Sequence, residues 1–309
     1  MGGARPHGGR LSPTRPLPTA RPPWAAVATT LILALALLGG CTVDRGPAAR
    51  VGSGTPAPTT TTSTTVPVDP AIEDIVSGAG MTDLGRRLFL SASPAVEDPV
   101  TLAQSCAEVD SAGGPDGAHT FGCLIDGQIH IRSFGPPEIR DLIYVVAAHE
   151  LLHVVYGRLT RAEHLALDPE LQAARLDDAI LQERLEVYAS VAEDTPNEVH
   201  SLLGTEFAGL SPALEAHYAE YFDRALVLDV FQRTLGDRED EIRALKASIG
   251  AMEVSLDNLQ AKLEALDAAG DVEGYNATVD RFNQLVAEHN AAVGHVNDLV
   301  EEDNRLTGS

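Results

Sequence analysis

The sequence predicts an α+β protein. We expect a small antiparallel sheet with a mostly helical domain, followed by an antiparallel coiled-coil helical hairpin. Three observations predict this arrangement. Asp126-Gly127 lies between two apolar-rich flanks, which is a strong β-hairpin signal. From Pro137 onward the spacing of apolar residues is helical almost throughout. Beyond residue 236, two runs of apolar residues repeat at alternating steps of three and four, as the seam of a coiled coil does.

Length and charge limit the classes of function. The chain has 309 residues, enough for one or two domains, and its hydrophobic content of 44% is sufficient for a packed core. Its 45 acidic and 22 basic residues give a formal net charge of −23. Because no basic patch is available to neutralise phosphates, we expect no nucleic-acid partner.

Residues 1–41 have the organisation of an export signal. Four arginines are the only charges in the first forty residues, and an apolar run over 25–38 follows them. That run is short for a membrane span, which needs roughly 20 residues. The run ends in LLGGC at Cys41, which resembles a bacterial lipobox. The resemblance implies cleavage before Cys41 and a lipid on its sulfur. The alternative is an uncleaved membrane anchor, and both interpretations place the remaining chain at the cell membrane on its extracytoplasmic face.

Residues 42–70 are rich in threonine and proline and lack apolar periodicity, so we expect a flexible linker. Beyond it, the two remaining cysteines are Cys106 and Cys123. In an exported chain they most simply form one disulfide, which would stabilise the fold by roughly 3 kcal/mol. The alternative is two buried free thiols.

Residues 71–235 are expected to form one domain with the sheet at its beginning. The run RRLFLSASPAV, residues 86–96, begins like a strand, and the strand 128–132 could be an edge of the sheet. Residues 142–159 read as one apolar helix. Thr160 with Glu163 forms a capping box that starts the next helix.

Residues 236–309 are expected to form the coiled-coil hairpin, with a break at DAAGDVEG. The first seam consists of Ile242, Leu245, Ile249, Met252, Leu256, Leu259, Leu263 and Leu266. The second seam consists of Tyr275, Val279, Phe282, Val286, His289, Val293, Val296 and Val300.

The stretch VVAAHELLHVVYG, residues 145–157, carries the strongest chemical signal. On a helix, His149 and His153 lie on one face about one turn apart, so both imidazoles can reach one metal ion. Glu150 lies one step round the helix, where it can accept a proton from a water on that ion. Zinc lowers the pKa of such a water to about 7. The alternative is a buried helix that contains two core histidines.

At these residues the chain resembles the zincin superfamily of metallopeptidases, whose motif AHELLH matches. The resemblance covers roughly residues 85–210. It implies zinc ligands at His149 and His153, Glu150 as general base, and an edge strand that holds the substrate backbone above the zinc. The strand 128–132 could supply that edge.

The third zinc ligand stays open. Position 159 is Leu159, so the chain lacks the third histidine of the elongated motif. The resemblance then implies a glutamate on a later helix. Asn197-Glu198 followed by Ser201 resembles the Asn-Glu-x-x-Ser run of thermolysin-like enzymes, although the acidic residue expected next is Leu202. Glu198 could instead be the capping partner of Thr195.

Other glutamates could complete the site. Glu206 is the main rival to Glu198, because it follows an apolar helix face on which a lone carboxylate needs a partner such as a metal. The remaining candidates are Glu183, Glu186 and Glu193. An enzyme also needs a donor to the developing oxyanion. The candidates for that donor are His200, His217, Tyr218 and Tyr221, which could equally belong to the core.

The sequence therefore predicts a membrane-tethered, extracytoplasmic Zn²⁺-dependent peptidase that acts on a peptide or protein substrate. The alternative is a non-catalytic envelope interaction protein. It would bind a protein partner through its coiled coil and retain a structural or degenerate zinc site.

Overall fold

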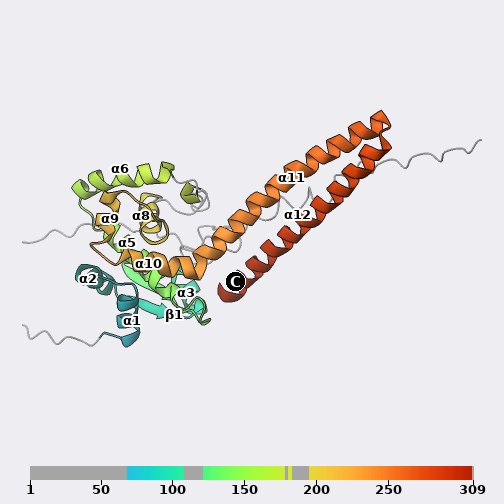
Figure 1. Ribbon diagram of the computed structural model, residues 1–309. Coiled ribbons are helices and arrows are strands. Elements are labelled where there is room, and N and C mark those ends of the chain that lie inside the picture. Colours follow the sequence, from blue (N-terminus) through green and yellow to red (C-terminus); the bar gives the residue numbers. More distant parts are fainter. Residues whose placement is uncertain (1–67, 108–120, 178–179, 183–194, 308–309) are drawn as a thin grey trace, which may run out of the picture. The chain divides into compact units, whose positions relative to one another are not determined.

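The structure is a computed structural model that describes residues 68–107, 121–177, 180–182 and 195–307. These residues belong to one compact unit and are mostly helical, with one three-stranded mixed sheet (Figure 1). The predicted signal or anchor 1–41 with Cys41, and nearly all of the linker 42–70, lie outside the described residues. Within the described ranges, no helix is both long and apolar enough to cross a membrane.

Two short helices, α1 (Pro70–Gly78) and α2 (Asp83–Ser91), precede the first strand in the chain, and α3 (Pro99–Ser105) follows it. The strand-like interpretation of residues 86–96 is largely wrong, because α2 covers most of this run and β1 (Ala95–Glu97) only its end. The side chain of Thr82 accepts a hydrogen bond from the Gly85 N–H and caps α2, and Phe89 is fully buried on the inner face of α2. A good cap and a helical apolar face together outweigh the strand propensity of this short run.

The sheet has the strand order β1-β3-β2, with β2 spanning Gly122–Ile125 and β3 spanning Gln128–Arg132. The predicted hairpin is confirmed: β2 and β3 are antiparallel, and Asp126 and Gly127 both have positive φ, as a tight primed turn requires. The expectation of an antiparallel sheet is corrected, because β1 pairs with β3 in parallel. The strand 128–132 is therefore the centre of the sheet, and the edges are β1 and β2.

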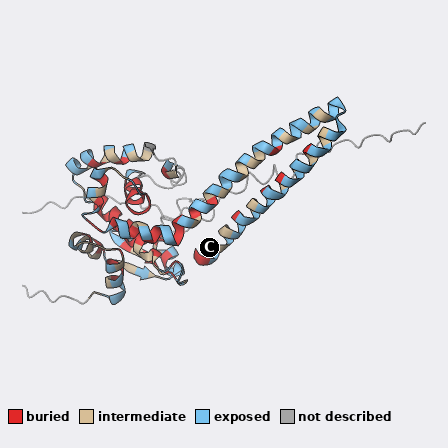
Figure 2. Cartoon of the chain, in the orientation of Figure 1, coloured by how far each residue is buried: buried red, intermediate tan, exposed pale blue. Residues whose placement is uncertain are grey.

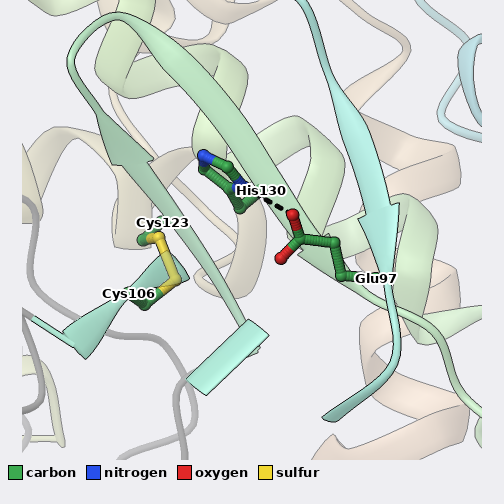
Figure 3. Close-up of a disulfide and its surroundings, with 4 residues drawn as sticks. All are labelled: Glu97, Cys106, Cys123 and His130. Atoms are coloured by element: carbon green, nitrogen blue, oxygen red, sulfur yellow. Dashed lines mark hydrogen bonds and ion pairs between the residues drawn. A yellow bond between two sulfur atoms is a disulfide. The ribbon is translucent and has the colours of Figure 1, made fainter. Parts of the chain in front are cut away.

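The predicted disulfide is present between Cys106 and Cys123, with the sulfur atoms 2.02 Å apart. It joins the end of α3 to β2 (Figure 3). On the neighbouring strands, His130 Nδ1 lies 2.9 Å from Glu97 Oε1. The disulfide therefore links α3 to β2, and the ion pair links β1 to β3.

The core is built around α5 (Leu142–Tyr156), in which 13 of 15 residues are buried. It packs against the sheet and against α1, α2, α8 (Thr195–Glu206) and α10 (Arg224–Phe231). Figure 2 shows the buried residues concentrated where these elements meet. Two further helices, α6 (Arg161–Asp177) and α9 (Pro212–Tyr218), pack on each other. The capping box before α6 is confirmed, because Thr160 N–H donates to Glu163 and Glu163 N–H donates to Thr160.

The π-helical turn η2 (Gln232–Gly236) leads into α11 (Asp237–Ala269), which is followed by α12 (Val272–Thr307). These two long helices lie side by side (Figure 1) and are joined at Gly270, whose left-handed φ of 69° permits the tight turn. The heptad positions predicted as seams are buried or half-buried in both helices, and Leu256 and Val296 are almost completely buried. The second predicted seam is only partly correct, because Thr278 and Leu285 of α12 are buried while their predicted neighbours Val279 and Val286 are half-buried.

Candidate metal centre

Two helices supply the candidate metal ligands. His149 and His153 occupy adjacent turns of α5, which is buried on nearly all sides, so both imidazoles point into the protein. Glu198 lies in the first turn of α8, which packs along α5. The packing of α5 on α8 therefore adds one carboxylate to the two histidines. All three residues are at most 2% exposed.

The donor atoms converge as metal ligands do. The Nε2 atoms of His149 and His153 are 3.1 Å apart, and each lies 3.6 Å from an oxygen of Glu198. Donors placed 2.0–2.2 Å from one ion at tetrahedral angles are roughly 3.3–3.6 Å from each other. The three separations in the structure are close to this range. The group could thus hold a metal ion with little rearrangement.

The protonation of the histidines suits ligation. The Nδ1 atom of His153 lies 3.1 Å from Asn197 Oδ1, which can only accept, so Nδ1 carries the proton and the Nε2 lone pair faces the cluster. Burial lowers the pKa of His153 to about 4, although the contact with Asn197 opposes this shift. Burial, with the nearby His153 and His200, also lowers the pKa of His149 well below its ordinary value. Both imidazoles are therefore neutral at pH 7.

Glu150 is completely buried and lies against the backbone of β2. A Cβ atom on Gly122 would lie 2.8 Å from Glu150 Oε1 and 2.7 Å from Val146 Cγ1, so any other residue would require these side chains to shift. The sequence interpretation missed Gly122. The signal that could have revealed it is a glycine inside an otherwise apolar strand, which often marks a close approach of the backbone.

The structure brings Glu198, and not Glu206, to the histidine pair. Glu206 ends α8, and its eight-residue separation from Glu198 corresponds to about 12 Å along the helix. Among the described residues, the group whose donor atoms could bind one metal ion contains Glu198 and not Glu206. The alternatives Glu183, Glu186 and Glu193, and the side chain of Thr195 that Glu198 could cap, lie outside the described residues.

Leu202, where the resemblance leads one to expect a carboxylate, is fully buried. His149 Nδ1 makes no hydrogen bond within the part of the chain that the structure describes. Among these residues, His149 therefore lacks an orienting acceptor such as the one that Asn197 offers to His153.

The candidate oxyanion donors contact one another, with His200 in α8, His217 and Tyr218 in α9, and Tyr221 just after α9. His200 Nε2 and His217 Nε2 are 2.8 Å apart, and the rings of His217 and Tyr221 are 5.4 Å apart. The Tyr218 hydroxyl donates to the main-chain oxygen of His200 at 2.8 Å, and burial raises the pKa of that hydroxyl. The hydroxyl proton of Tyr218 is thus already donated within the core and is not available to an oxyanion. Burial and the neighbouring His217 also lower the pKa of His200.

No profile of a known protein family, no characterised protein and no solved structure matches the chain.

Proposed function

We propose that the protein is a membrane-tethered, extracytoplasmic zinc-dependent peptidase, with a zincin-like domain over residues 71–235. The observation that carries the proposal is the convergence of His149, His153 and Glu198 at metal-ligand distances, with Glu150 next to the first ligand in sequence. Two imidazoles and one carboxylate form a donor set typical of catalytic zinc, in which a fourth position stays open.

In this proposal, Glu150 and Asn197 have distinct roles in peptide-bond hydrolysis. Bound zinc supplies a Lewis acid that polarises a peptide carbonyl and makes water acidic enough to lose a proton near neutral pH. Glu150 would accept that proton on its carboxylate and pass it to the nitrogen of the departing amine. Asn197 would keep the His153 ring oriented through the contact with Nδ1.

The strand that would bind the substrate is β2, in place of the predicted 128–132. Arg132 N–H donates to the Phe121 oxygen, and Gly122 lies opposite Ile131, so the main-chain groups of Gly122 and Leu124 point away from β3. An extended peptide pairing with that side of β2 would pass beside Glu150, because Gly122 lies against the Glu150 carboxylate.

Residues 1–41 would anchor the protein at the membrane, through a lipid on Cys41 or as an uncleaved anchor, and 42–70 would be the linker. The helices α11 and α12 would form a coiled-coil hairpin that binds a protein partner.

The test of the proposed function combines metal analysis with cleavage. The purified full-length chain should contain about one zinc per chain by mass spectrometry, as a three-ligand site predicts. It should also cleave fluorescein-labelled casein, and a chelator should abolish the cleavage. Glu150→Gln should keep the zinc and lose the cleavage. A folded chain that binds no added zinc would overturn the proposal.

The burial of the site favours a second candidate function. His149 and Glu150 are completely buried, so a substrate can reach them only after neighbouring residues move. In this second candidate, the zinc site is structural and the paired helices bind an envelope protein. Zinc-loaded protein that cleaves neither casein nor a peptide library, but still binds a partner through α11 and α12, would favour it.

A further inference from the structure

Arg132, at the end of the central strand β3, is a buried cation. The residue is only 8% exposed, and its guanidinium carbon lies 5.4 Å and 5.8 Å from the ring centres of Phe121 and Phe134. Within the described ranges, no carboxylate forms an ion pair with Arg132. A buried guanidinium needs a compensating partner of some kind, because desolvation of an unpaired charge is costly.

The compensating partner is the end of α12. Arg132 Nη2 donates to the main-chain oxygen of Thr307, the last described residue of α12. The final carbonyls of a helix lack partners within the helix and carry partial negative charge. The buried cation and the helix end therefore partly compensate each other, although Arg132 Nε makes no hydrogen bond among the described residues. Leu306 is 3% exposed and belongs to the same apolar cluster as the residues of α5.

Arg132 also connects the end of α12 to the candidate catalytic base. The Arg132 N–H donates to the Phe121 main-chain oxygen at 2.8 Å, and the side chain of Arg132 lies over the Phe121 ring. Gly122 follows Phe121 directly, and its backbone lies against Glu150. Thr307 thus contacts Arg132, Arg132 contacts Phe121 at the start of β2, and the next residue of β2 lies against Glu150.

We propose that Arg132 is a positioning residue for the peptidase site. By binding the last turn of α12, it holds Phe121 so that the first residue of β2 stays against Glu150. This inference rests on the proposed function. It also makes α11 and α12 part of the scaffold of the site, because the end of α12 is one side of the Arg132 contact.

The test compares two substitutions of the same chemical kind in the full-length, zinc-loaded chain. Arg132→Met keeps an apolar stem between the two aromatic rings and removes the donor to Thr307. The control Arg238→Met removes the partner of Asp303, one turn earlier on α12, in a contact that does not involve the sheet. Both variants are measured at a temperature at which circular dichroism shows them fully folded.

Two readouts separate positioning from general stability. The first is the hydrogen exchange of the β2 amides, which does not depend on cleavage. The second is the division between kcat and KM for an internally quenched peptide that the wild type cleaves.

Arg132→Met should speed up exchange across 121–125 and lower kcat up to about 100-fold, because a displacement of about 1 Å costs that much. Its zinc content should stay unchanged. Arg238→Met should leave β2 exchange and kcat close to wild type. Arg132→Lys should recover part of kcat.

The outcomes of the two proposals can be told apart. Unchanged β2 exchange in Arg132→Met, or equal losses in both variants, would overturn the positioning role. Faster β2 exchange in a protein whose wild type cleaves nothing would support the link from α12 to β2 while refuting the peptidase proposal. If Arg132→Met does not fold, Arg132→Lys decides with the same readouts, because it keeps the charge but offers a single donor group.

Discussion

Replacing Glu198 by glutamine separates a metal ligand from a structural residue. The Glu198 oxygens lie 3.6 Å from the Nε2 atoms of His149 and His153, and the residue is 2% exposed. Without metal, the protein must bury a carboxylate beside two neutral imidazoles, which is unfavourable. Glu198→Gln should therefore leave the metal-free protein as stable as the wild type, or more stable.

With zinc the sign of the effect reverses. If loss of the charged ligand weakens zinc binding about 100-fold, the stabilisation by saturating zinc falls by about 2.7 kcal/mol. For a folded region of this size, each kcal/mol corresponds to about 2–4 °C in Tm, so the zinc-loaded variant should melt about 5–10 °C below the wild type. Differential scanning calorimetry with zinc and with EDTA measures both effects.

The matched control is Glu206→Gln, the same substitution at the other end of α8. It should change neither the zinc affinity nor the difference between the two melting curves. The reasoning is refuted if Glu198→Gln lowers Tm equally with zinc and with EDTA, since that is the behaviour of a helix cap. It is equally refuted if Glu206→Gln weakens zinc binding as much as Glu198→Gln does.

Three further substitutions test other parts of the structure. Replacing both Cys106 and Cys123 by serine should lower the free energy of unfolding by about 3 kcal/mol in urea titrations, and a reductant should have no further effect on that variant. Gly122→Ala should lower the free energy of unfolding by about 1–3 kcal/mol, because the added methyl group overpacks against Glu150. It should also slow casein cleavage while the zinc content is retained. Normal activity would contradict the close approach of β2 to Glu150. Tyr218→Phe should cost about 1 kcal/mol of stability and leave casein cleavage unchanged, because the hydroxyl already donates within the core. A large loss of activity in folded Tyr218→Phe would restore this residue as an oxyanion donor.

The end of α12 contributes contacts to the domain that contains the candidate site. Removal of residues 237–309 would take away Thr307, the acceptor of the buried Arg132, and Leu306, which belongs to the main apolar cluster. Such a deletion would test stability and function together. Substitutions at exposed positions of α11 and α12, such as Val254, which is 62% exposed, test partner binding without disturbing these contacts.

The parts of the fold that sequence predicted well are those set by local spacing. Asp126-Gly127 specifies a tight turn because both residues tolerate positive φ. The capping box of Thr160 and Glu163 is complete within four residues. Local patterns also failed in places. The run over residues 86–96, for example, begins like a strand but lies mostly in α2, whose cap at Thr82 and buried Phe89 favour a helix.

The sequence by itself determined that His149 and His153 share one helix face with Glu150 beside them, because an interval of four residues is one turn. It also indicated the pairing of Cys106 with Cys123. Only the tertiary structure placed Glu198, and not Glu206, beside the two histidines. It also made β2 rather than 128–132 the edge strand that lies against Glu150, and it brought Thr307 to Arg132. These contacts join segments that are far apart in the chain: His153 meets Asn197 across 44 residues, and Arg132 meets Thr307 across 175. Such contacts depend on how buried surfaces pack together, and no local spacing specifies that packing.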